Sequence, residues 1–78
     1  MLAENMNIES LSKDKLWAIL VETVHSNVMY PTHKSYTREV ILRANPDISA
    51  VELADRLNMA EGEALVILDE LKPKKSQI

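Results

Sequence analysis

Apolar residues recur at helical spacing in four segments of the chain, and this periodicity is the main structural signal in the sequence. The residues between and outside these segments lack it. Residues 1–11 are expected to form a flexible leader, and residues 73–78 a basic tail. We therefore expect a single all-α domain, a small four-helix unit, with helices over residues 12–29, 35–45, 49–58 and 60–72.

The first predicted helix carries an apolar stripe that is wider than one buried face requires. Ser12 is its expected N-cap, and Pro31 is expected to end it, because proline disfavours helical geometry in the residue before it. The apolar and threonine side chains cover an arc of about 200°, whereas one-sided burial needs little more than about 100°. The surplus predicts a homodimer formed through this helix. The expected contact residues are Leu16, Trp17, Leu20 and Val24.

Trp17 is open to two interpretations. Tryptophan is enriched at the centres of protein interfaces, so it is a candidate anchor for the dimer. Burial of its large ring in the core of a single chain is an equally good explanation.

The second helix is expected to follow a linker at residues 30–34. Ser35 or Thr37 is the expected N-cap, since a hydroxyl at this position accepts a hydrogen bond from a free backbone N–H. The sequence Asn45-Pro46-Asp47 is expected to end the helix, because proline cannot continue it.

The third helix has the clearest start signal in the chain. Ser49 and Glu52 have the S-x-x-E spacing of a capping box, and Ile48 and Leu53 stand at the two positions of a hydrophobic staple. Asn58 follows the helix and is the non-glycine residue that best tolerates a left-handed backbone. The pattern predicts a tight turn at Asn58, with the fourth helix directly after it.

The fourth helix has acidic residues at its start and a lysine at its end. Glu61 and Glu63 lie at the positive end of the helix dipole and Lys72 at the negative end, so these charges have a structural explanation. Leu65 and Val66 point away from the expected core and need cover from the first helix or from a partner chain. The sequence therefore predicts a partner-binding face formed by Glu61, Glu63, Leu65 and Val66.

Residues 53–60, Leu-Ala-Asp-Arg-Leu-Asn-Met-Ala, resemble the helix-turn-helix pattern of a leucine-alanine pair, a second leucine, a turn residue, an apolar residue and a small N-cap. Asn58 replaces the usual glycine, and Ala60 replaces the usual serine or threonine. The resemblance implies a tri-helical core and a DNA-binding regulator. A winged-helix version would need a β-hairpin after the fourth helix, and the few residues from Lys72 onward are too short for one.

The resemblance also implies which residues would face the DNA groove. In this chain none of them donates to guanine or binds a phosphate. A DNA-binding role would instead depend on phosphate contacts by basic residues elsewhere, and the simpler explanation of the basic tail is a solvated segment. The groove-facing positions are Glu61, Gly62, Glu63, Leu65 and Val66, and the candidate phosphate contacts are Arg38, Arg43, Arg56, Lys72, Lys74 and Lys75.

Composition narrows the possible functions. Nine Lys and Arg against twelve Asp and Glu give a net charge of −3, which opposes a main role in neutralising phosphates. The chain has no cysteine and one glycine, so it lacks a thiolate metal site and a glycine-rich phosphate loop. His25 and His33 lack metal-ligand spacing and are expected at the surface. We expect no enzyme activity, no cofactor and no small-molecule substrate.

The sequence shows neither a membrane span nor a secretory signal. Its longest apolar run, Leu16 to Val21, is six residues, far short of the roughly 20 that cross a bilayer. Glu4 and Glu9 stand where a secretory signal would carry positive charge. We therefore expect a cytoplasmic protein without a membrane partner.

Two functions from different classes fit these observations. The first is a small helix-turn-helix-like interaction module that self-associates and binds a protein partner. The alternative is a dimeric DNA-binding transcriptional regulator. The two differ in whether the basic residues converge on one surface beside the fourth helix.

Overall fold

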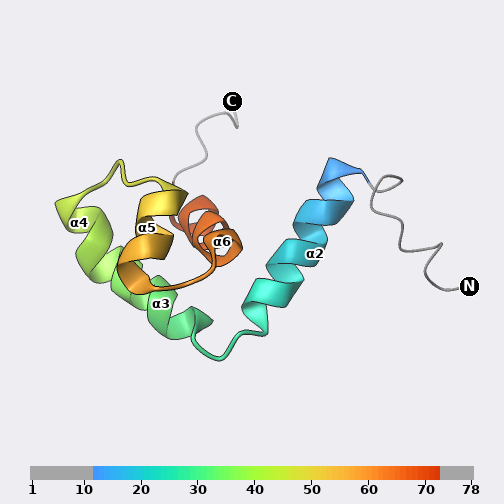
Figure 1. Cartoon of the computed structure of the whole chain (residues 1–78), viewed down its shortest axis with the longest axis horizontal. Coiled ribbons are helices and arrows are strands. Elements are labelled where there is room, and N and C mark those ends of the chain that lie inside the picture. The colour runs from blue at the N-terminus through green and yellow to red at the C-terminus, as the bar shows by residue number, and fades with distance from the viewer. Residues whose placement is uncertain (1–11, 73–78) are drawn as a thin grey trace, which may run out of the picture.

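A computed structural model describes residues 12–72 and shows a small all-α domain, which confirms the expected fold class (Figure 1). The described residues contain helices and no strand. Because α3, η2 and α4 follow one another without a break, they form one continuous helical segment with a π-helical turn in its middle. The elements are α2 (Lys13–His25), α3 (Tyr30–Tyr36), η2 (Thr37–Ile41), α4 (Leu42–Ala44), α5 (Ala50–Leu57) and α6 (Glu61–Leu71).

Helix α2 starts where the sequence predicts and ends earlier. The Ser12 hydroxyl accepts a hydrogen bond from the Lys15 backbone N–H at 3.1 Å, which confirms the N-cap. The helix ends at His25 instead of near residue 29. The Asn27 side chain accepts from the Met29 backbone N–H at 2.8 Å, and such a local bond offers the backbone an alternative to the helix.

The predicted linker at residues 30–34 is helical, so that prediction is wrong. Helix α3 begins at Tyr30 with Pro31 in its first turn. The first N–H groups of a helix have no partner within the helix, and proline, which lacks an N–H, loses nothing there. Pro31 therefore starts the next helix, and the preceding break is made by residues 26–29.

The π-helical turn η2 lies in the middle of the second helical segment. The Thr37 hydroxyl donates to the His33 backbone carbonyl at 2.7 Å, and Thr37 is buried. Ile41, at the end of the turn, is also buried and points into the core. The wider turn thus places a threonine and an isoleucine on the inner face of the segment.

The hairpin of α5 and α6 matches the sequence closely. The Ser49 hydroxyl accepts from the Glu52 N–H at 3.1 Å, and the Glu52 carboxylate accepts from the Ser49 N–H at 3.2 Å, so the capping box is confirmed. Asn58 has a φ of 56°, the left-handed conformation expected for the turn. Ala60 stands at the N-cap of α6 and gives it no side-chain hydrogen bond.

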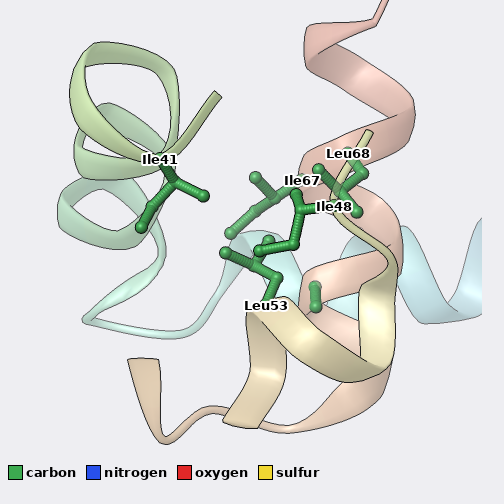
Figure 2. Close-up of a cluster of buried hydrophobic side chains, with 6 residues drawn as sticks. Ile41, Ile48, Leu53, Ile67 and Leu68 are labelled. Atoms are coloured by element: carbon green, nitrogen blue, oxygen red, sulfur yellow. The ribbon is translucent and has the colours of Figure 1, made fainter. Parts of the chain in front are cut away.

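The hydrophobic core lies between the second helical segment, α5 and α6 (Figure 2). It contains aliphatic residues and alanine, as the composition requires. Helix α6 is the central element, because it packs against α5 and also against α2. The buried cluster consists of Ile41, Ile48, Leu53, Ala64, Ile67 and Leu68.

Helix α2 stands beside this compact group of helices and packs against α6 (Figure 1). Gly62 permits the close approach, since a Cβ there would lie 3.0 Å from Leu20 Cδ1. Val24 of α2 and Val66 of α6 are both buried. The inner side of α2 is thus used within the chain. Among residues 12–72, no helix has the length and apolar character needed to span a bilayer.

Candidate interaction surface

A buried carboxylate fixes the junction of α2 and α3 to the start of α6. Glu63 is 4% exposed, and its Oε2 lies 2.7 Å from His33 Nδ1. The Asn27 side-chain amide donates to the same carboxylate at 3.4 Å. Buried charges are normally paired, and this one takes partners from the loop after α2 and from α3. Glu63 is therefore part of the internal structure of the domain.

A second carboxylate, Glu70, joins the same segments two turns further along α6. The Tyr30 hydroxyl donates to it at 2.5 Å and the Lys34 ammonium at 3.1 Å, while His25 Nε2 lies 2.7 Å away. The His25 and Tyr30 rings also contact each other, with centroids 4.8 Å apart and planes tilted by 41°. Two residues of α6 thus hold both histidines of the chain.

The hydrogen bonds around Glu70 shift the pKa values of Glu70, Tyr30 and Lys34. Burial alone would raise the pKa of Glu70, but the hydrogen bonds from Tyr30, His25 and Lys34 outweigh it and lower the pKa. Burial and the contact with Glu70 raise the pKa of Tyr30. Hydrogen bonds with Tyr30 and Glu70 raise the pKa of Lys34. The cluster is therefore most stable with a charged carboxylate, a charged lysine and a neutral phenol.

We expect Glu70→Gln to remove a pH-dependent part of the stability. The pKa of Glu70 is lower in the folded chain than in the unfolded one, so its contribution is complete above the ordinary glutamate range and is lost as the pH falls through the lowered value. At pH 7 the variant should lose about 1 kcal/mol of unfolding free energy, since the amide still accepts hydrogen bonds. Urea denaturation from pH 7 to pH 3 should show this difference shrinking.

Glu39→Gln is the matched control for this experiment. Glu39 pairs with Arg38 at 3.2 Å, and both side chains are more than half exposed. Exposed pairs contribute little, so we expect a loss near zero at every pH. A difference between the wild type and Glu70→Gln that stays constant down to pH 3 would contradict the role given to the Glu70 charge.

The two histidines have structural partners, which the sequence did not predict. His25 is exposed and His33 half-buried, and each lies against a glutamate of α6. Over residues 12–72, no group of three or more His, Cys, Asp or Glu side chains is placed to hold a metal ion. The only sequence signal for these pairs is the spacing of Glu63 and Glu70, which puts both on one face of α6 two turns apart.

An open groove of about 500 Å³ runs between α2 and the start of α5, with α6 as its floor. Trp17 forms one wall and is 37% exposed, and Leu65 on the floor is 46% exposed. Polar groups stand among the lining residues, so the groove combines apolar contact area with possible hydrogen-bonding partners. The lining residues are Trp17, Ile48, Ser49, Ala50, Leu65, Leu68, Asp69 and Lys72.

Sequence reasoning singled out Trp17 and Leu65 of this groove and missed its other wall. Ile48 precedes α5 and Ala50 is its first residue, and periodicity within one helix cannot show which neighbouring segment will lie opposite. The groove results from the way α2 meets α6, which is a property of the tertiary packing. Lys72, a candidate phosphate contact in the DNA-binding alternative, lines the groove.

The residues predicted for self-association divide between two sides of α2. Leu16 and Trp17 are each 37% exposed. Leu20 is half-buried against Gly62, and Val24 is buried. Leu20 and Val24 therefore serve the contact with α6, and the exposed large apolar residues of α2 are Leu16, Trp17 and Ile19.

The predicted partner-binding face on the fourth helix is only half available. Glu61 and Leu65 are exposed, whereas Glu63 and Val66 are buried. The chain's own fold covers the latter two, because His33 pairs with Glu63 and α2 packs on α6. A partner that approaches this side meets Leu65 within the groove and Glu61 at the start of α6.

The described basic candidates for DNA contact come from four different places. Arg38 lies in η2 and pairs with Glu39, Arg43 lies in α4, Arg56 lies in α5, and Lys72 follows α6. Lys74 and Lys75 lie outside the described residues, as do the predicted leader and tail. Comparisons of the chain with models of protein families, with curated proteins and with solved structures found no match.

Proposed function

We propose that this chain is a small helix-turn-helix-like interaction module that self-associates and binds a protein partner through the groove between α2 and α5. The observation that carries the proposal is this groove, which exposes Trp17 and Leu65 side by side with polar residues. Apolar cores with polar rims are typical of protein interfaces. A cytoplasmic location would fit such a module and belongs to the same proposal.

The shape of the groove favours a helical partner segment. Trp17 of α2 forms one wall, the segment that leads into α5 forms the other, and α6 forms the floor, so a further helix can lie between the walls and place apolar residues on Leu65 and Leu68. Trp17 would then cover the bound segment from one side, as tryptophan does at many binding hot spots. Ser49 and Lys72 offer hydrogen bonds to the polar side of the segment.

The same observations weaken the DNA-binding alternative. The face of α6 that would have to enter a DNA groove is partly covered by α2, and Glu63 is paired with a histidine. The described candidates for phosphate contact lie in η2, α4 and α5 and after α6, and Arg38 among them pairs with Glu39. Phosphate binding requires several cations to act together, and this distribution does not favour it.

The groove can be tested with a displayed library of amphipathic helical peptides. Selected peptides should bind the chain and change the fluorescence of Trp17, the only tryptophan. Leu65→Glu should weaken this binding about tenfold or more, because it places a charge on the apolar floor of the groove. Val51→Glu is the matched control, since Val51 is an exposed apolar residue of α5 outside the groove lining.

If Leu65→Glu leaves peptide binding unchanged, the groove is not the partner site. Anisotropy with a labelled mixed-sequence DNA duplex, titrated from low to physiological salt, tests the alternative. We expect no binding at physiological salt. Tight, steeply salt-dependent binding would support phosphate contacts and overturn the proposed function.

A further inference from the structure

The outer side of α2 has the spacing of a coiled-coil seam. Leu16, Ile19 and Thr23 follow one another at steps of three and four residues, and all three are exposed. Such alternating steps place side chains on one stripe that can pack against another helix. This outer seam differs from the inner side of α2, where Leu20 and Val24 meet α6. Helix α2 therefore has a second face that stays partly exposed among residues 12–72.

Two opposite charges flank this seam on the same side. Lys15 directly precedes Leu16, and Glu22 directly precedes Thr23, so both occupy equivalent positions one heptad apart. Both are exposed. Between two antiparallel helices, the flanking residues on this side face each other, which brings Lys15 of one helix to Glu22 of the other and the reverse. In a parallel pair, Lys15 would instead lie beside Leu20, without a charge partner.

We propose that two copies of the chain pair through antiparallel α2 helices, with Leu16 of each copy packed on Ile19 of the other. The inference rests on the self-association in the proposed function and specifies its geometry. The partner helix that fits this seam is α2 of a second copy. Each seam carries both a positive and a negative charge, so a two-fold axis places opposite charges across from each other. Lys15 and Glu22 then form two identical salt bridges across the dimer.

The proposed interface is small, which limits the affinity of the dimer. Two layers of aliphatic contacts bury less than the roughly 1,200 Å² of a stable standard interface. The dimer is therefore weak and reversible, and it weakens with added salt because its ion pairs are exposed. Trp17 lies outside the seam, so each copy in the pair keeps its groove open to a partner.

Charge reversal tests this geometry. Sedimentation equilibrium at low salt should show a dimer for the wild type and about tenfold weaker association for Lys15→Glu and for Glu22→Lys, because each variant places two like-charged pairs across the interface. The double variant Lys15→Glu/Glu22→Lys should recover the wild-type affinity. Asp14→Lys, a charge reversal on α2 away from the seam, should leave the association unchanged.

Mixing the two single variants gives a second, independent readout. Every ion pair is restored in the mixed dimer, so native mass spectrometry should find mainly the mixed species. If the wild type dimerises and the double variant or the mixture shows no recovery, the antiparallel seam is wrong while self-association stands. A wild-type chain that stays monomeric at high concentration and low salt overturns both the antiparallel pairing and self-association. The peptide experiment then tests separately whether the groove binds a partner.

Discussion

Replacing Glu63 with alanine is expected to lower the free energy of unfolding by about 3 kcal/mol. The carboxylate is 4% exposed, and its removal leaves the His33 ring and the Asn27 amide without their shared partner. A domain of this size has a total stability of roughly 5 to 15 kcal/mol, so the loss is a large part of it. Thermal denaturation followed by circular dichroism at pH 7 should show a decrease in Tm of more than about 10 °C.

Two further variants make the test of Glu63 specific. Glu61→Ala changes an exposed carboxylate in the same first turn of α6 and should cost less than about 1 kcal/mol. The double variant Glu63→Leu/His33→Leu replaces both partners with apolar side chains and should be more stable than Glu63→Leu alone. A Glu63→Ala variant as stable as Glu61→Ala would contradict the structural role of the pair.

Leu53→Ala is expected to destabilise the domain by about 3 kcal/mol, through lost burial and the cavity that remains. Leu53 is 0% exposed and belongs to the buried hydrophobic cluster (Figure 2). Chemical denaturation gives the change directly, provided that the slope with denaturant stays constant.

Val51→Ala is the control for the core substitution. Val51 belongs to the same helix and is 60% exposed, so its truncation removes few contacts and should change the stability by less than about 0.5 kcal/mol. Equal losses for the two variants would mean that α5 does not pack through Leu53.

The parts of the fold that depend on neighbouring residues could be predicted from the sequence. The capping box of Ser49 and Glu52 and the left-handed Asn58 are both local devices, and both are present as expected. Pro31 was misjudged because proline fits two places equally well, just after a helix and in the first turn of one. The structure places Pro31 in the first turn of α3, after a break in which Asn27 accepts from the Met29 backbone N–H, and periodicity does not reveal that bond.

The candidate surface was less predictable, because it depends on how helices pack. The wide apolar stripe of α2 did indicate two faces, but the sequence could not assign Leu20 and Val24 to α6 and Leu16 and Ile19 to the outside. That division follows from the contact of Leu20 with Gly62, two residues far apart in the chain. The burial of Glu63 was missed for the same reason, since its partner His33 lies thirty positions earlier.

The attachment of α2 also bears on the order in which the domain opens. Helices α5 and α6 are adjacent in sequence and share the core, so their contacts close only a short loop. Helix α2 joins them through the approach of Leu20 to Gly62, the buried Val24 and the pair of His25 with Glu70. It should therefore detach before the rest unfolds, and its amide hydrogens should exchange with solvent faster than those of α6.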